Sequence, residues 1–286
     1  MASRKQQKEE ARQRRLEQER AAAAQAGRRR RLQMLGGVLV AAVAVIAVAI
    51  AISAGSSSGA PSAKPHSKEA VAADQHVDAL LAGIPESGNT LGNPKAPVTV
   101  TEFGDLECSV CDVFATPPSF TNPEGESGTG WEDDLISQYV RKGVVKLVYR
   151  SLETASSGNP NSSAFALQQA AANAAGLQDK AWYYIELFYN EQGAEDSNYV
   201  SESYLEGLAK QIPGLNFSKW MADRNLASVK SQVTSDNAAG TAADTATGNG
   251  PSTPTLVVQG PDGKHILPPG LPNSYSSLTS AIKSVD

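Results

Sequence analysis

The sequence predicts an α/β domain over residues 75–286, with a helical insertion inside it and a single transmembrane helix before it. Three observations lead to this prediction. An uncharged apolar run stands near the N-terminus, strand-like segments occur at 98–103, 144–152 and 254–259, and a long Ala- and Gln-rich stretch separates the last two. Strands that flank helical segments are typical of a layered α/β fold.

The N-terminal region, residues 1–33, is a basic tail. Residues 1–31 hold eleven Lys and Arg against four Glu, a net charge of +7, whereas the rest of the chain has a net charge of −12. So sharp a division indicates two environments for one chain rather than a basic nucleic-acid-binding protein, and we expect no nucleic-acid partner.

The apolar run at residues 34–55 contains no charged side chain. About twenty helical residues span the apolar core of a bilayer, and the run is longer than the apolar part of a cleavable signal peptide. We therefore expect an uncleaved anchor, with cleavage near Ala51–Ser53 as the alternative. The linker that follows has only Lys64 and Lys68, so the charge asymmetry places the N-terminus in the cytoplasm and the C-terminal domain outside, at the cell membrane.

The segment after the apolar run is expected to be a flexible linker, residues 56–74, because Ser, Gly, Ala and Pro dominate it. A short amphipathic helix is predicted over 72–84 and turns over 85–97. The strand 98–103 then places Val98, Val100 and Glu102 on one face.

The rest of the domain alternates between strands and helices. A short helix is expected after residue 108, and another over 131–143. Four helices are predicted between residues 161 and 235, so the helical insertion occupies about 159–247. A hairpin over 254–269 and a capped terminal helix over 273–286 complete the domain.

The two cysteines of the chain, Cys108 and Cys111, lie in "GDLECSVCDVF". A structural zinc site needs four Cys or His ligands, and the chain has only three His, so we expect no metal. A structural disulfide would close a loop of only four residues, which is worth about 2 kcal/mol in the chain-entropy estimate. Neither use explains the pair well.

A redox-active disulfide between Cys108 and Cys111 fits the spacing better. Helical positions i and i+3 hold Cβ atoms about 5–6 Å apart, whereas a disulfide prefers about 3.8 Å, so the bond can form but is reducible. The strand before the pair and the helix after it place Cys108 at a helix N-terminus, which stabilises a thiolate. Cys111 lies one turn inside, where it can resolve a mixed disulfide.

The stretch "LGNPKAPVTVTEFGDLECSVC" resembles the segment that leads into the active site of DsbA-like thiol-disulfide oxidoreductases, in their membrane-anchored bacterial type. Phe103, Asp105 and Glu107 fall on the pattern together with the two cysteines. The resemblance spans roughly residues 85–286 and includes "STPTLVV" at the position of the family's cis-proline loop. It implies a thioredoxin-like fold with a helical insertion.

The resemblance also implies roles for three further residues. Thr253 and Pro254 are expected to form a cis peptide that faces the cysteines and pairs with an extended substrate through the backbone. Glu102 is expected to accept a proton from the resolving thiol, although an exposed sheet carboxylate remains the alternative. We expect Asp105 and Glu107 to be surface charges.

The resemblance and the residues together predict an extracytoplasmic thiol-disulfide oxidoreductase that needs no cofactor. The leading interpretation of its direction is an oxidase. A reductase or isomerase in the same compartment and a non-catalytic peptide-binding module are the alternatives. The dipeptide Ser109–Val110 lacks the His that would help to stabilise a thiolate, so a weaker oxidant is expected. Its partners would be exported cysteine-containing proteins and a membrane redox partner that resets the cysteines.

Overall fold

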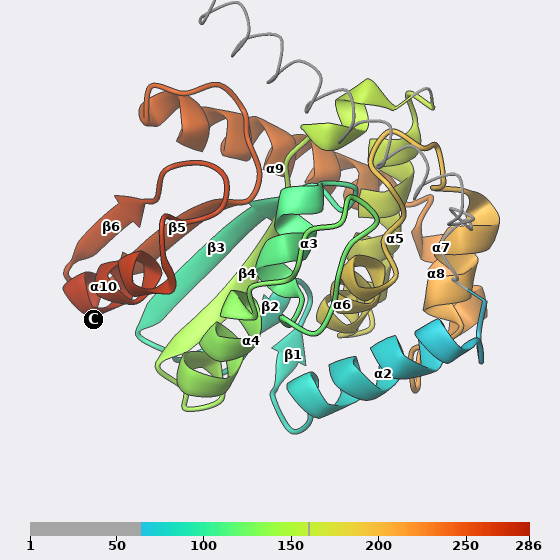
Figure 1. The fold of residues 1–286 in the computed structure, drawn as a ribbon, viewed down its shortest axis with the longest axis horizontal. Coiled ribbons are helices and arrows are strands. Elements are labelled where there is room, and N and C mark those ends of the chain that lie inside the picture. Colours follow the sequence, from blue (N-terminus) through green and yellow to red (C-terminus); the bar gives the residue numbers. More distant parts are fainter. Residues whose placement is uncertain (1–63, 160) are drawn as a thin grey trace, which may run out of the picture. The chain divides into compact units, whose positions relative to one another are not determined.

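A mixed six-stranded sheet forms the centre of the computed structural model, which describes residues 64–159 and 161–286. The strand order is β1-β2-β4-β3-β5-β6 (Figure 1). Strands β3 and β4 run parallel, and β5 pairs antiparallel with the other side of β3. The strands are β1 (Glu86–Ser87), β2 (Thr90–Leu91), β3 (Val98–Gly104), β4 (Val145–Ser151), β5 (Thr255–Gly260) and β6 (Gly263–Ile266).

Strand β3 is central because it lies between β4 and β5. The predicted alternation is confirmed: Val98, Val100 and Glu102 are buried, whereas Thr99 and Thr101 are half-buried. β-Branched side chains suit a pleated strand of this kind. The strand ends at Gly104, where an added Cβ would meet the Tyr149 ring and the Tyr189 hydroxyl group, and the chain then turns into the cysteine segment.

Helices cover both faces of the sheet. On one face, Val98, Val100 and Val258 belong to the main core together with Cys111, and the helices there include α3 (Ser109–Ala115), α4 (Trp131–Leu135) and α10 (Tyr275–Val285). On the other face, Phe103, Leu152 and Val257 pack against Ala239 and Ala243 of α9 (Ala227–Ala246). Helices, sheet and helices therefore form three layers.

The helical insertion is observed where it was expected, with five helices rather than four. The first four lie on the side of the sheet away from β5 and β6, whereas the last runs across the sheet and contacts both β4 and β5 (Figure 1). The additional helix arises because Leu226 adopts an extended conformation, which separates the helix at Phe217–Asp223 from the one that continues to Ala246. The helices are α5 (Ala164–Gly176), α6 (Ala181–Asn190), α7 (Glu202–Ala209), α8 (Phe217–Asp223) and α9.

The expected linker over 56–74 is wrong at its C-terminal end, because α2 (Lys68–Leu81) already begins at Lys68. The Ser67 side chain accepts a hydrogen bond from the backbone N–H of Ala70, which caps the helix. Ala70, Ala73 and Val77 are buried, so packing on the domain stabilises the helix beyond its sequence propensity.

The expected helix over 131–143 is observed as α4 followed by a π-helical turn, Ile136–Val140. Gly143 has a positive φ of 73°, which fits the predicted helix end. In the part of the chain that the structure describes, no helix has the length and apolar character needed to cross a membrane. The expected basic tail, anchor and first linker residues fall outside that part, so the anchor and the domain boundaries stay predictions.

Candidate active site

The cysteine pair lies at the junction of β3 and α3. Cys108 is the N-cap residue of α3 with an extended backbone, and Cys111 lies one turn inside the helix. Cys108 is 6% exposed and Cys111 is fully buried, and both are free thiols. The strand–turn–helix context predicted from the sequence is therefore observed, with one thiol at the edge of the protein and the other in its core.

The two thiols have opposite acidities. A hydrogen bond from Cys111 is the main cause that lowers the pKa of Cys108, and burial opposes it. Burial raises the pKa of Cys111 well above its usual value, and the interaction with Cys108 raises it further. Thiolate is the reactive form of cysteine, so Cys108 is suited to attack and Cys111 is held as a thiol until its neighbour reacts.

Thr253 and Pro254 face the pair, as the resemblance implied. The peptide bond between them is cis. The Sγ atom of Cys108 lies 3.6 Å from the carbonyl oxygen of Thr253, although the two residues are 145 positions apart in the chain. The hydroxyl groups of Thr253 and Thr154 are 2.6 Å apart, which ties this loop to the turn after β4.

The expectation that Asp105 is a surface charge is wrong, because its carboxylate is fully buried. It accepts hydrogen bonds from the backbone N–H groups of Glu107, Thr154 and Ser156, and from the side chains of Ser156 and Gln168. Burial raises the pKa of Asp105, and these hydrogen bonds oppose the shift. Asp105 thus joins the cysteine segment to the turn that holds Thr253.

Glu107 is likewise buried, at 1% exposure, rather than a surface charge. The side-chain amide of Asn159 donates a hydrogen bond to it at 2.7 Å. Burial and, next, the charge of Asp105 raise the pKa of Glu107 to about 7. The carboxyl group beside Cys108 therefore changes its charge near neutral pH.

Glu102 points into the protein, which decides between the two interpretations of this carboxyl. It is 1% exposed, and neither carboxylate oxygen has a hydrogen-bond donor among the described residues. Burial raises the pKa of Glu102 to about 7, and interactions with Glu132 and Tyr189 oppose the shift. Its charge in turn raises the pKa of Cys111. Glu102 therefore lies within electrostatic reach of the resolving thiol.

A segment of the helical insertion, residues 191–195, contacts the cysteine turn, and sequence reasoning missed it. The Gln192 side-chain amide donates to the carbonyl oxygens of Leu106 and Cys108. The Glu195 carboxylate accepts a hydrogen bond from the backbone N–H of Ser109 at 3.1 Å. A carboxylate thus accepts a hydrogen bond from one of the backbone N–H groups that the helix leaves free at the start of α3.

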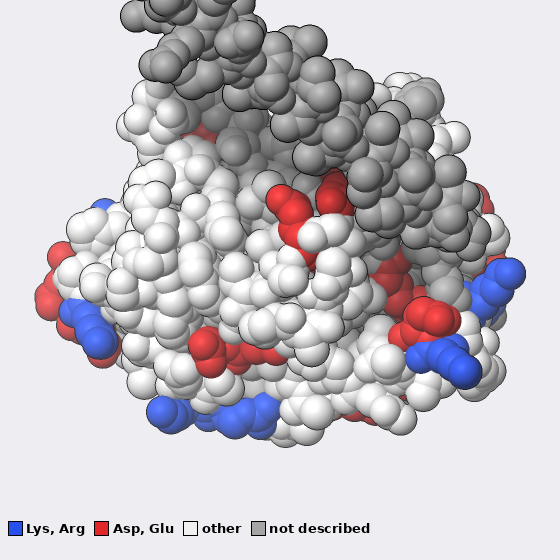
Figure 2. Space-filling model, in the orientation of Figure 1, with Lys and Arg blue, Asp and Glu red and all other residues white. Residues whose placement is uncertain are grey.

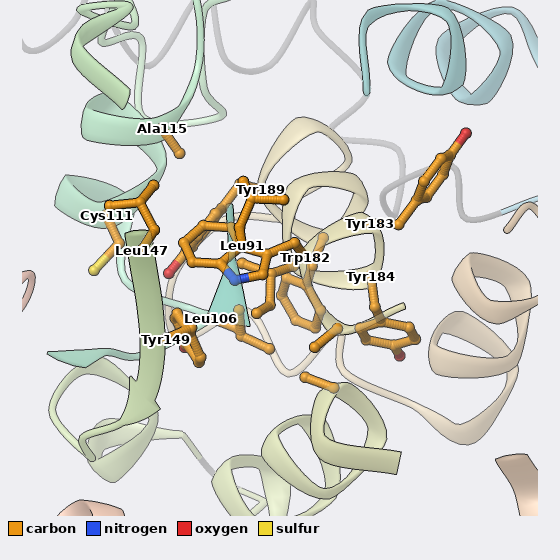
Figure 3. Packing of buried hydrophobic residues seen from close by; sticks show 14 of the residues in the cluster. Leu91, Leu106, Cys111, Ala115, Leu147, Tyr149, Trp182, Tyr183, Tyr184 and Tyr189 are labelled. Carbon is orange, nitrogen blue, oxygen red and sulfur yellow. The ribbon is translucent and has the colours of Figure 1, made fainter. Parts of the chain in front are cut away.

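The aromatic side chains of α6 belong to the core, and among them Tyr183 also lines a surface pocket, beside Asp78 and Lys180. Trp182, Tyr184, Phe188 and Tyr189 are fully buried and Tyr183 is 6% exposed. Figure 3 shows Trp182, Tyr184 and Tyr189 in the same hydrophobic cluster as Cys111. The helical insertion therefore supports the site from behind by packing against the helix that holds the cysteines.

Comparisons with known proteins agree with this architecture. No family model matches the chain. The chain is 25% identical over 154 residues to the "Probable disulfide bond formation protein D" of Bacillus cereus and to the protein of that name in Bacillus anthracis. The alignment covers 52% of this chain and 61% of each relative, so the chain spans less than two thirds of their length.

Among solved structures, the chain is similar to BdbD from Bacillus subtilis in its oxidised form. The TM-score is 0.50 at 19% identity, and the match covers 70% of this chain and 96% of that one. At this identity the likeness concerns the fold alone. The described domain has the mixed α/β, thioredoxin-like fold that the sequence resemblance implied.

Proposed function

We propose that the chain is an extracytoplasmic thiol-disulfide oxidoreductase that exchanges disulfides with exported proteins through Cys108 and Cys111. The observation that supports it most is the asymmetry of the pair. Cys108 has a lowered pKa at the edge of the protein, whereas Cys111 has a raised pKa in its interior. Exchange needs one thiolate that attacks and a second thiol that resolves the mixed disulfide.

The proposal assigns substrate binding to Thr253 and Pro254. The Thr253 carbonyl oxygen lies beside the Cys108 sulfur, so an extended peptide that pairs with this backbone would bring its own sulfur to Cys108. Backbone pairing tolerates many sequences. On the visible part of the face in Figure 2, most side chains are uncharged, Asp and Glu are scattered across it, and Lys and Arg lie toward its edge. Such a surface suits a partner recognised without a strong charge requirement.

Glu102 is proposed as the group that takes a proton from Cys111 when it attacks and returns one when it leaves. Its pKa of about 7 allows both steps at neutral pH.

We place the domain outside the cytoplasm, where disulfides persist, and propose that residues 34–55 anchor it in the membrane. A membrane redox partner would then restore the disulfide after each cycle. The names of the Bacillus relatives support a role in disulfide bond formation.

The favoured direction is oxidation of substrates. A low thiol pKa stabilises the reduced form and makes the disulfide a better oxidant. The Glu195 carboxylate near Ser109 and the absence of a His between the cysteines work against it. We expect a reduction potential between about −270 mV, the thioredoxin value, and about −120 mV, the DsbA value.

The decisive test of the roles is a trapping experiment in cells. Cys111→Ser should accumulate mixed disulfides with exported proteins on non-reducing gels, because the resolving thiol is missing. Cys108→Ser serves as the matched control and should trap nothing. The reverse pattern would refute the assignment of attacking and resolving thiols.

Equilibration with glutathione, followed by alkylation and mass measurement, separates the remaining alternatives. An oxidase gives a potential above the thioredoxin value, whereas a potential at or below about −270 mV favours the reductase. A peptide-binding module would keep one redox state across all glutathione ratios.

A further inference from the structure

Three buried glutamates from three different elements form a cluster behind the active site. Glu102 lies on β3, Glu132 on α4 and Glu186 on α6, and each is at most 1% exposed. None of their six carboxyl oxygens has a hydrogen-bond donor among the described residues. Buried polar groups are normally hydrogen-bonded, so three unpartnered carboxyls in one region need an explanation.

Other buried carboxylates of this domain show what a structural role looks like. Asp105 accepts five hydrogen bonds from a turn and a helix. Asp244 accepts them from the Ser252 backbone and the Thr255 hydroxyl. The three glutamates have no such partners and therefore tie no segments of the fold together.

The electrostatic neighbours of the cluster favour bound protons. Burial raises the pKa of Glu102 to about 7 and the pKa values of Glu132 and Glu186 well above their usual range. The charge of Glu102 raises the pKa of both Glu132 and Glu186, and the charge of Glu186 raises the pKa of Glu132, so the three carboxyls interact as one group. The other titratable groups that act on the cluster, or on which it acts, are Asp133 of α4, Cys111 of α3, Tyr149 of β4 and Tyr189 of α6.

The cluster has an exit to the surface at Asp133. The Asp133 Oδ1 atom lies 3.5 Å from Nε2 of His76, which belongs to α2. The His76 side chain is 28% exposed, although its Nε2 is buried, so the ring joins the interior to the exterior. It lines a surface pocket of about 340 Å³ with Glu69, Pro117, Phe120 and Asn190.

The opposite end of the cluster is the resolving thiol. Cys111 is fully buried, and the charge of Glu102 raises its pKa. When Cys111 leaves a disulfide it gains a proton, and when it attacks a mixed disulfide it loses one. Glu102 is itself sealed from solvent, so a proton that it accepts has no direct route out.

We propose that Glu132, Glu186 and the Asp133–His76 pair conduct protons between Glu102 and the pocket at His76. This inference rests on the proposed exchange function. In the resolving step, the Cys111 proton passes to the Glu102 carboxylate, the Cys111 sulfur bonds to the Cys108 sulfur, and the partner's thiolate leaves. The cluster then releases one proton through His76, and it returns one when Cys111 next becomes a thiol.

The test separates the two steps of oxidation by oxidised glutathione. Rapid acid quenching, alkylation and mass measurement resolve the reduced protein, the mixed disulfide at Cys108 and the internal disulfide. We expect His76→Ala, Glu132→Gln and Glu186→Gln each to slow the collapse of the mixed disulfide roughly 10-fold at pH 7. This is less than the roughly 100-fold or larger effect of a group that itself takes the reacting proton. Formation of the mixed disulfide at Cys108 should keep its rate.

Imidazole provides the readout that a purely structural role would not change. Added to His76→Ala, it should enter the pocket and restore collapse toward the wild-type rate, whereas it should not rescue Glu132→Gln. The matched control is Glu86→Gln. Glu86 also has a pKa raised to about 7 by burial, but it accepts a hydrogen bond from the Trp182 backbone and lies outside the cluster. Its collapse rate should equal that of the wild type.

Two results would overturn the proton route. One is collapse at the wild-type rate in all three variants, and the other is slowing in His76→Ala that imidazole does not reverse. A wild-type protein that forms no mixed disulfide with glutathione would instead refute the proposed function, so the two failures are distinguishable. If Glu132→Gln does not fold, Glu186→Gln and His76→Ala still decide the question.

Discussion

Cys108 and Cys111 are separated by two residues, yet Cys108 lies at the edge of the protein and Cys111 lies in its core. The environment of Cys108 favours the thiolate, and that of Cys111 favours the thiol. Position in the helix alone does not produce this difference. It depends also on burial, which raises the pKa of Cys111, and on the hydrogen bonds with Cys111 and Thr253, which lower the pKa of Cys108. The Glu195 carboxylate beside the Ser109 N–H is a negative charge near the same turn.

Replacing Glu195 with Gln should lower the pKa of Cys108 by about half a unit, because a negative charge near the start of α3 is removed. The measurement is the rate of Cys108 alkylation against pH in a Cys111→Ala background. Glu153→Gln is the control, since no contact with the cysteine turn involves its side chain. An unchanged or raised pKa in Glu195→Gln would show that this carboxylate does not oppose the thiolate.

The sequence was sufficient to predict the residues that lie next to each other in the chain or in a known pattern. The cysteine pair and the cis peptide at Pro254 belong to this group, whereas the sequence left the orientation of Glu102 open. The burial of Asp105 and Glu107 could not be predicted, because their partners, Ser156 and Asn159, come from a turn about fifty residues further on. A lone Glu in the aromatic stretch "AWYYIELFYN" was the one available signal for Glu186.

Helix α9 shows how one element can position the site without touching the cysteines. Its buried positions, Val229, Val233, Asp236, Gly240 and Asp244, recur every three or four residues and face the sheet. The buried face of this helix is only weakly hydrophobic, because two of these five residues are Asp and one is Gly. This is why the helices predicted from the sequence end at residue 235, although a regular helix continues to Ala246.

Gly240→Ala should destabilise the domain by roughly 1–3 kcal/mol, although Ala is the better helix former. A Cβ at this position would lie 2.9 Å from the Phe103 ring and 3.1 Å from Leu152. Urea unfolding with an unchanged m-value would measure the loss. Ser235→Ala, at an exposed position of the same helix, should leave stability equal or slightly higher. A Gly240→Ala protein as stable as the wild type would show that α9 is free to move off the sheet.

Asp244→Asn should loosen the loop that presents Thr253. Its carboxylate accepts hydrogen bonds from the Ser252 N–H and the Thr255 hydroxyl, and bonds to a charged group are worth about 1.5–3 kcal/mol. We expect a loss of that order in urea unfolding, together with faster alkylation of Cys108 because the loop covers it less. Stability loss without a change in Cys108 reactivity would argue against a positioning role.

For the whole molecule, buried carboxyls make stability depend on pH. Burial is the main cause that raises the pKa of Asp112 to about 8, and of Glu86, Glu102 and Glu191 to about 7. The folded state therefore binds more protons than the unfolded chain between about pH 4.5 and pH 8. Stability is then highest below the unfolded pKa values and falls as the pH rises through the folded ones.

The reduced domain should accordingly lose at least ~3 kcal/mol of unfolding free energy between pH 5 and pH 9. Urea titrations at both values would measure it. Asp112→Asn should remove part of the dependence, so that its stability relative to the wild type improves at pH 9 compared with pH 5. A wild-type stability that stays level or increases over this range would contradict the shifts.

The central place of β3 also sets an order of assembly. Its neighbour β5 follows about 150 residues later, after every helix of the insertion, so such long-range pairing forms late in folding. A chain that is synthesised from its N-terminus therefore exposes the unpaired edge of β3. It also exposes two thiols that Thr253 does not yet cover. Until β5 and β6 have formed, the nascent protein has exposed thiols, like the unfolded exported chains on which the folded protein is proposed to act. Folded copies of the same protein are therefore expected to be among its first partners.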